Sequence, residues 1–217
     1  MTTIVYIGTE RYMELFPQFY ESACKIQGDK NLILLTNKAA KISDSPECPI
    51  INVQHIDHLP WPLITLLKFH YLESVLDNCG DYVLYANSNF VFNEGLELEL
   101  NNKVNLAYMD TDTYREYRTW PTHNEFNCDL RHVLGGFIYA RKDLMHDVCK
   151  DIIWNVNRDM FQGCIRPLHD ETALNQHYSR NVDKCQIWEI HTFGHLTNSL
   201  YTSGQRFKPF IPTTIKY

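Results

Sequence analysis

Two adjacent carboxylates, Asp170 and Glu171, are the side chains of this sequence best suited to chemistry. They belong to the segment His169-Asp170-Glu171-Thr172-Ala173-Leu174-Asn175, which has the pattern of a helix start. A helix dipole favours negative charge at that place, so an acidic first turn with a capping role is one interpretation. A carboxylate on the ligand side of a sheet would instead serve as a nucleophile or stabilise a cationic sugar transition state. The residues alone leave both interpretations open.

The polar triplet Asn87-Ser88-Asn89 follows an apolar run at 82–86 and precedes another at 90–92. In an open α/β sheet, the position just after a strand faces the ligand. Aspartates here would chelate a divalent ion, whereas neutral amides are poorer metal ligands. An asparagine amide still accepts from sugar hydroxyls and donates to phosphate. The triplet therefore indicates a ligand site without a metal, with an asparagine-rich turn as the alternative.

A glycine pair, Gly135-Gly136, interrupts the apolar run at 133–139. Without side chains, the backbone there would allow a substrate to approach closely. A bulge in a strand would explain the same pair equally well.

Hydrophobic periodicity alternates along the chain between that of strands and that of helices. Strands are expected at 3–8, 31–36, 82–86, 104–109, 133–139 and 185–190, and helices at 12–23, 61–76, 144–160 and 170–178. This alternation predicts an α/β fold with a central, mostly parallel sheet flanked by helices. Ligands are then expected at the carboxyl ends of the strands, where the triplet lies. The polar loop between the strands at 104–109 and 133–139 is long enough to be functional.

Composition excludes several classes of protein. The chain has 217 residues, 44% of them hydrophobic, and a net charge of −6, so we expect a single domain over 1–217 and no nucleic-acid partner. No run approaches the roughly 20 apolar residues of a transmembrane helix, and no secretion signal is recognisable. Seven scattered cysteines without a Cys-x-x-Cys pair indicate neither a disulfide framework nor a zinc knuckle. We therefore expect a soluble cytoplasmic protein without a membrane span.

The order of these features resembles glycosyltransferase family 6, which contains the mammalian blood-group and α-1,3-galactosyl enzymes and small bacterial members. The resemblance covers about residues 3–180. At the position of Asn87-Ser88-Asn89, vertebrate members have Asp-x-Asp and bacterial members have Asn-x-Asn. The other matching features, in chain order, are the uridine-binding segment Ile7-Gly8-Thr9-Glu10-Arg11-Tyr12, Trp61, Lys68, Gly135-Gly136 and His169-Asp170-Glu171 with Leu174-Asn175.

The resemblance implies a GT-A-type domain and a retaining transfer of galactose or N-acetylgalactosamine. The donor would be the uridine diphosphate (UDP) sugar, the partner an acceptor glycan with a terminal galactoside, and the new linkage α-1,3. With Asn-x-Asn in place of Asp-x-Asp, no cofactor is expected. Glu171 matches the position proposed as nucleophile or transition-state stabiliser.

The resemblance also implies binding positions for the donor. The residues matching donor-sugar positions are Asp170, Lys68, Gly135 and Gly136. Those matching nucleotide and diphosphate positions are Ile7, Gly8, Thr9, Tyr12, Asn87 and Asn89. The C-terminal segment 181–217 is expected to close over the donor.

The acceptor side departs most from the family pattern. Leu168 replaces the tryptophan that precedes the His-Asp-Glu motif, and the segment 110–131 is shorter than its family counterpart. The acceptor-binding candidates are His169 and Trp120, the latter because a tryptophan in a polar loop can stack on a sugar face. The resemblance therefore does not identify the acceptor.

Two other functions stay open. Asp110-Thr111-Asp112 would form an Asp-x-Asp metal site, and Asp170 through Asn175 is similar to the Asp-x-Asp-x-Leu-Asn element of glycosyltransferase family 8. That interpretation predicts a metal-dependent hexosyltransferase that uses Mn²⁺. The asparagine triplet also fits an inactive sugar-nucleotide-binding module. Because no anchor or stem is recognisable, a bacterial or bacteriophage origin is expected.

Overall fold

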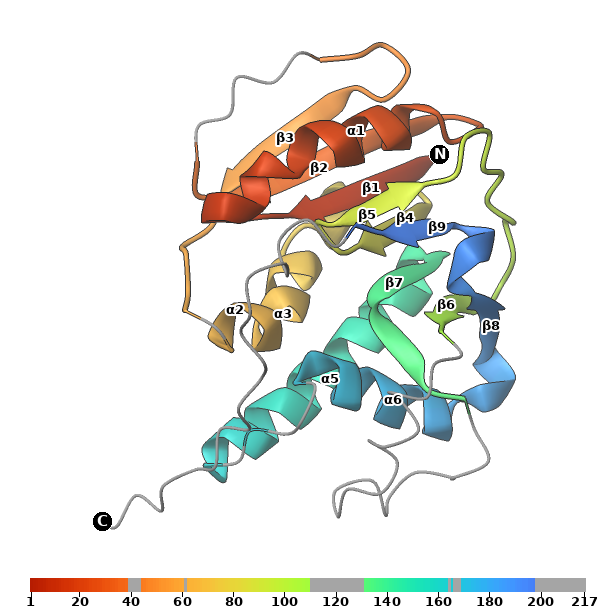
Figure 1. Ribbon diagram of the computed structural model, residues 1–217. Helices are drawn as coiled ribbons and strands as arrows, with labels where there is room; N and C mark the ends of the chain where they lie inside the picture. The colour runs from red at the N-terminus through yellow and green to blue at the C-terminus, as the bar shows by residue number, and fades with distance from the viewer. Residues whose placement is uncertain (39–43, 61, 110–130, 164, 166–168, 198–217) are drawn as a thin grey trace.

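The computed structural model describes residues 1–38, 44–60, 62–109, 131–163, 165 and 169–197. Within these residues, seven strands form one sheet in the order β3-β2-β1-β4-β7-β6-β8 (Figure 1). The strands are β1 (Thr2–Ile7), β2 (Lys30–Thr36), β3 (Ile50–His55), β4 (Tyr82–Ala86), β6 (Val104–Tyr108), β7 (Val133–Arg141) and β8 (Cys185–Glu189). Neighbouring strands are parallel except at β7, which runs antiparallel to β4 and β6. The predicted α/β class with a mostly parallel central sheet is confirmed.

Helices cover both faces of this sheet (Figure 1). One face carries α1 (Phe16–Cys24) and a small antiparallel sheet of β5 (Phe90–Phe92) and β9 (Gly194–Leu196). The opposite face carries α2 (Leu63–Leu66), α3 (Lys68–Glu73), α5 (Lys142–Phe161) and α6 (Asp170–Arg180). Short 3-10 helices lie at η1 (Glu10–Glu14), η2 (Leu76–Asn78), η4 (Val182–Lys184) and η5 (Ile190–Thr192).

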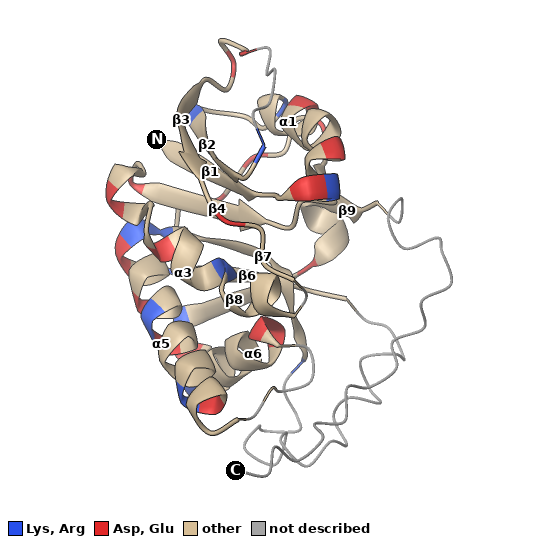
Figure 2. Cartoon of the chain, turned by 90° about the vertical axis from the view of Figure 1, so that its left-hand side faces the viewer, with Lys and Arg blue, Asp and Glu red and all other residues tan. Residues whose placement is uncertain are grey.

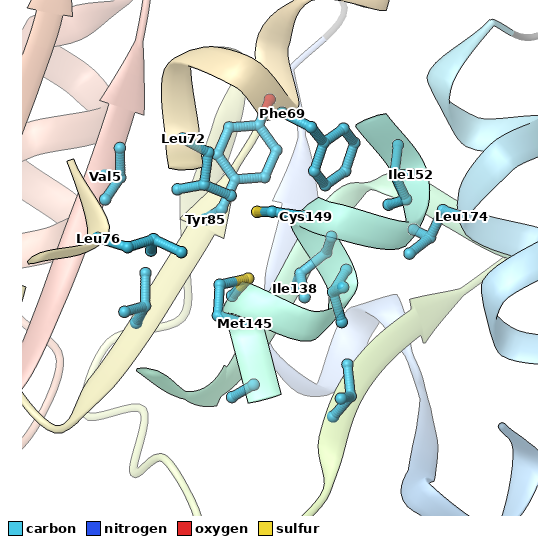
Figure 3. Close-up of a cluster of buried hydrophobic side chains, with 14 of the residues drawn as sticks. Val5, Phe69, Leu72, Leu76, Tyr85, Ile138, Met145, Cys149, Ile152 and Leu174 are labelled. Atoms are coloured by element: carbon cyan, nitrogen blue, oxygen red, sulfur yellow. The ribbon is translucent and has the colours of Figure 1, made fainter. Parts of the chain in front are cut away.

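The central strands are apolar on both faces because both faces are covered. In β4, Val83 and Tyr85 belong to the core beneath α3, α5 and α6, whereas Leu84 and Ala86 belong to the core beneath α1. Figure 3 shows the ring of Tyr85 among the apolar side chains of the first core, beside Phe69 of α3. The alternation along β4 thus holds the tyrosine ring in the core and directs its hydroxyl to the carboxyl end of the strand.

Two predicted helices are interrupted. The helix expected at 61–76 is divided between α2 and α3 at Leu67, whose φ of −94° and ψ of 0° lie outside the α-helical range. The helix expected at 12–23 begins as η1, and α1 starts only at Phe16. Pro17 lies in its first turn, where N–H groups have no partner within the helix, so the N–H that proline lacks costs no hydrogen bond.

Strand β3 is not among the predicted strands. It is an edge strand whose apolar Ile51 and Val53 are 49% and 56% exposed, while the polar Asn52 and Gln54 are partly buried. In the usual pattern of a half-buried strand, apolar residues alternate with polar ones and the apolar ones are buried. Here the exposed residues of 51–54 are the apolar ones, so this pattern could not identify the strand.

Truncation of Ile152 should destabilise the fold. This side chain is fully buried where α5 faces the sheet, so Ile152→Ala should lower the free energy of unfolding by about 3 kcal/mol. The control, Val53→Ala on the exposed edge, should change it by less than about 0.5 kcal/mol. Urea denaturation measures both values, and equal effects would place Ile152 outside the core.

Candidate active site

The polar ends of several strands meet at one edge of the sheet. Parallel strands β1, β2 and β4 all end there, and antiparallel β7 begins there, as the pairing of Ala86 with Phe137 shows. The backbone N–H of Asn87, the first residue after β4, donates to the Gly136 carbonyl at 2.8 Å. The reversed direction of β7 therefore brings the glycine pair beside the asparagine triplet.

The glycine pair forms a bulge in β7. Pairing between β6 and β7 jumps from Leu106–Ile138 to Tyr108–Val133, so residues of β7 around the glycines are left out of the ladder. Side chains satisfy the freed peptide groups: the Gly135 N–H donates to Glu171 Oε2 at 2.7 Å, and Lys68 Nζ donates to the Gly135 carbonyl at 2.7 Å. The pair thus lies at an irregularity of the β6–β7 ladder, as the bulge interpretation expects, and both predicted acids lie against it.

Close packing requires glycine at these two positions. A Cβ on Gly135 would lie 3.0 Å from both Asp170 Oδ2 and Glu171 Cβ. A Cβ on Gly136 would lie 2.6 Å from Asn87 Nδ2. The bulge thus brings the start of α6 and the end of β4 against the same stretch of bare backbone.

Charged residues lie mainly along the helices and loops, with both signs intermixed on α5 (Figure 2). Lys68 and Asp170 also lie on helices but are buried, since their side chains are only 10% and 6% exposed, and their charged atoms are 2.5 Å apart. Burial raises the pKa of Asp170 to about 6, although the ammonium opposes that shift. Burial lowers the pKa of Lys68, but the nearby charge of Asp170 outweighs it and the net shift is upward. Both groups are therefore charged at neutral pH.

The carboxylate of Glu171 is held on both sides. Its Oε2 accepts the Gly135 N–H, and its Oε1 lies 2.8 Å from His132 Nε2, with the Glu171 side chain 16% exposed. Asn175, one turn later on α6, accepts from the Val133 N–H at 2.8 Å and donates to the Val133 carbonyl at 2.7 Å. Together these bonds fix the orientation of the Glu171 carboxylate relative to β7.

The first residue before α6, His169, has an unusual backbone. Its φ of 50° and ψ of −113° depart from the conformations that residues with side chains ordinarily adopt, and its side chain makes no capping hydrogen bond. His169 Nδ1 instead lies 3.4 Å from Thr65 Oγ1, and burial, with the charge of Lys68, lowers the pKa of the imidazole. Strained backbone of this kind gathers at functional sites, where the surrounding structure must hold it.

The two asparagines of the triplet face different partners. Asn87 Oδ1 accepts a hydrogen bond from the Tyr85 hydroxyl at 3.1 Å. Asn89 Nδ2 donates to the Thr197 carbonyl at 3.3 Å, and the Thr197 N–H donates to the Asn89 carbonyl at 2.8 Å. Asn87 therefore lies beside the glycine bulge, while Asn89 forms hydrogen bonds with Thr197, the residue after β9.

The predicted nucleotide segment lies at the end of β1. Ile7 is the last residue of this strand, and the Gly8 N–H donates to the Leu35 carbonyl of β2 at 3.0 Å. Thr9 Oγ1 lies 3.0 Å from His58 Nδ1, and the Tyr6 hydroxyl donates to the Tyr12 carbonyl at 2.6 Å. This segment thus occupies the same sheet edge as the triplet.

Glu10, in the middle of this segment, has a φ of 49°, a left-handed conformation that is uncommon for residues other than glycine. Asn37 holds it in place, because its Oδ1 accepts from the Glu10 N–H at 2.9 Å and its Nδ2 donates to Glu10 Oε1 at 2.6 Å. The strained turn is therefore supported by the residue that follows β2.

Some predicted site residues lie outside the described part of the chain. They are Trp61, Trp120, Leu168, the Asp110-Thr111-Asp112 triplet and the end of the C-terminal segment. Conversely, the structure adds three residues that sequence reasoning missed: Tyr85, His58 and His132. The available signal for Tyr85 was a hydroxyl group near the end of an apolar strand. The signal for His132 was its position directly before the strand that contains the glycine pair.

No group of three or more His, Cys, Asp or Glu side chains suited to a metal ion occurs among the described residues. Nor does that part of the chain contain a helix with the length and apolar character needed to cross a bilayer.

Comparison with known proteins bears on the chemistry of this edge. No family model matches the chain. Over 200 residues it is 25% identical to the O-antigen biosynthesis glycosyltransferase WbnI of Escherichia coli, with 82% of each chain covered. The similarity supports a glycosyltransferase. The sheet flanked by helices, with its polar residues at the carboxyl ends of the strands, is consistent with the GT-A-like fold of such enzymes.

Removal of the buried ammonium should destabilise the protein in a pH-dependent way. Lys68→Met leaves the Asp170 carboxylate buried without its ion-pair partner, so the free energy of unfolding should fall by about 3 kcal/mol or more near neutral pH. The control Lys25→Met breaks an exposed pair with Glu21 and should cost less than about 1 kcal/mol.

The sign of the pH dependence follows from Asp170. Its pKa in the folded protein lies above the ordinary 3.8, so the folded state favours the protonated acid, and loss of the ammonium raises that pKa further. The stability deficit of Lys68→Met should therefore grow as the pH rises from about 5 to about 8. Denaturation at several pH values measures it, and a deficit independent of pH would contradict the ion pair.

Proposed function

We propose that this protein is a retaining hexosyltransferase that moves galactose or N-acetylgalactosamine from its UDP donor to an acceptor galactoside. The linkage formed is α-1,3, and the reaction needs no metal ion. The observation that carries the proposal is the placement of Glu171, whose carboxylate is oriented by Gly135 and His132 at the strand edge that also holds Asn87. The similarity to a glycosyltransferase supports the general reaction, and the sequence resemblance supports the donor and linkage.

In this mechanism the donor's nucleotide lies along the end of β1 and its diphosphate lies near Asn87. Glu171 faces the β side of the anomeric carbon, and the bond from that carbon to the UDP oxygen breaks with its electron pair leaving on UDP. The carboxylate forms a glycosyl ester or stabilises the cationic sugar. The acceptor O3 then bonds to the anomeric carbon from the α side, which breaks the ester bond where one has formed, and the hydroxyl proton passes to a phosphate oxygen of the departing UDP. Retention follows because the acceptor enters from the face that UDP has left.

Asp170 and Lys68 act as a pair in this scheme. Above a pH of about 6 the carboxylate is ionised, and the ammonium holds it at the start of α6, next to Glu171. There it accepts hydrogen bonds from donor-sugar hydroxyls. Because Lys68 is directed into the protein, amide donors such as Asn87 stabilise the leaving diphosphate.

The choice of donor and the need for metal are tested by one set of assays. UDP-galactose, UDP-N-acetylgalactosamine and UDP-glucose are each offered with lactose-type acceptors, in EDTA and in Mn²⁺. We expect transfer of galactose or N-acetylgalactosamine at similar rates in both media. Transfer only with Mn²⁺ would contradict metal independence and favour the family 8-like alternative, in which Asp110 and Asp112 bind the metal.

The role of Glu171 is tested by Glu171→Gln. This change removes the charge with little change in volume, so transfer should fall by about 100-fold or more while the affinity for UDP stays within about threefold. The exposed Glu189 provides the control, since Glu189→Gln should leave both values unchanged. Unaltered transfer by Glu171→Gln would remove Glu171 from the chemistry.

A second candidate function is a sugar-nucleotide-binding module without turnover. Both Glu171 oxygens already have partners within the protein, which favours a structural carboxylate over a nucleophile. Measurable binding of UDP without hydrolysis or transfer of any of the three donors would establish this alternative.

A further inference from the structure

The amide of Asn87 uses only one of its two ends inside the protein. Oδ1 accepts from the Tyr85 hydroxyl at 3.1 Å, while no hydrogen bond from Nδ2 is formed to any other residue in the described part of the chain. The Asn87 side chain is half-buried, and its Nδ2 packs against Gly136, where a Cβ would lie only 2.6 Å from it. An amide donor is thus presented at the sheet edge without a partner among these residues.

Tyr85 determines which end of the amide is presented. The Lys68 ammonium lies 5.2 Å from the centre of the tyrosine ring. Burial raises the pKa of this phenol, and the positive charge of Lys68 opposes the shift. The Tyr85 hydroxyl donates its single proton to Asn87 Oδ1, so this end of the amide is held and Nδ2 is the end left for a ligand.

Lys68 itself is held away from the amide. Its Nζ donates to the Gly135 carbonyl at 2.7 Å and forms an ion pair with the Asp170 carboxylate at 2.5 Å. The contact of Asn87 Oδ1 is therefore with the neutral Tyr85 hydroxyl and not with the buried ammonium.

We propose that Tyr85 is a positioning residue that turns the Asn87 amide so that Nδ2 donates to the diphosphate oxygens of the donor. The same bond occupies Asn87 Oδ1, the only atom of this side chain that could bind a metal ion. The inference rests on the proposed function for the identity of the ligand. It explains why an asparagine at this position stabilises a diphosphate without a bridging cation.

Tyr85→Phe tests the proposal by removing one hydroxyl and keeping the buried ring. Its affinity for UDP and for uridine is measured by calorimetry in EDTA. UDP affinity should fall about tenfold, because the variant weakens one hydrogen bond to the charged diphosphate. Uridine has no diphosphate, so its affinity should stay within about twofold. Tyr82→Phe, at the other end of the same strand, should change neither. Equal loss for UDP and uridine, or a loss for UDP-galactose without one for UDP, would overturn the proposal.

A double-mutant cycle separates positioning from a purely structural effect. If Tyr85 acts through Asn87, Tyr85→Phe should add less than about twofold to the loss of UDP affinity already caused by Asn87→Ala. Additive losses in the double variant would show that the hydroxyl acts elsewhere and would overturn the proposal.

The orientation itself is measured without any ligand. The side-chain amide resonances of Asn87 are assigned by their loss in Asn87→Asp and compared between the wild type, Tyr85→Phe and Tyr82→Phe. They should shift in Tyr85→Phe alone, and unchanged resonances there would overturn the proposal. If the wild type fails to bind UDP, the proposed function is wrong, and this spectrum still decides whether Tyr85 orients Asn87.

Discussion

The buried ammonium of Lys68 is the interaction on which the arrangement of the sheet edge depends. A charge that is 10% exposed must be paired and hydrogen-bonded to remain ionised. Its partners are Asp170 at the start of α6 and the Gly135 carbonyl in β7, and it lies 5.2 Å from the ring centre of Tyr85 in β4. Each of these elements presents a residue to the proposed donor site. One cation on α3 therefore fixes the relative positions of the proposed sugar and diphosphate contacts.

The bulge in β7 makes this arrangement possible. A regular antiparallel strand would use the Gly135 peptide groups in the ladder with its neighbours. The bulge releases them, and Lys68 and Glu171 replace the lost strand partners. Because glycine leaves no Cβ in the way, the Asp170, Glu171 and Asn87 side chains approach the backbone directly. The same local irregularity thus orients the proposed nucleophile and packs against the proposed diphosphate contact.

Sequence patterns predicted the elements of this fold better than their contacts. The strand 82–86 and the helix from Asp170 have local signals, namely an apolar run and an acidic helix start, and both elements are present. The direction of β7 has no local signal, because antiparallel pairing with β4 and β6 depends on where the chain between β6 and β7 returns. Strand β3 was missed because the apolar Ile51 and Val53 are exposed while the polar Asn52 and Gln54 are partly buried.

In the site, too, the sequence predicted individual residues better than the contacts between them. Asp170, Glu171 and Asn87 were identified from residue type and position, since carboxylates and amides after apolar segments indicate ligand contacts. The ion pair between Lys68 and Asp170 joins residues far apart in the chain, and only the packing of α3 and α6 beside α5 on one face of the sheet brings them together. Tyr85 belongs to the strand expected at 82–86, and its ring lies in the core. Its hydroxyl acquires a role only because Lys68 and Asn87 lie at its two sides.

The central claim is that Glu171 acts on the β face of a UDP-linked sugar at this edge. It is tested most directly by the anomeric configuration of the product formed from UDP-α-galactose, read from the proton coupling at the anomeric carbon in a reaction containing EDTA. The account predicts an α-linked product. A β-linked product would show that the acceptor attacks the donor directly, and would contradict the role assigned to Glu171.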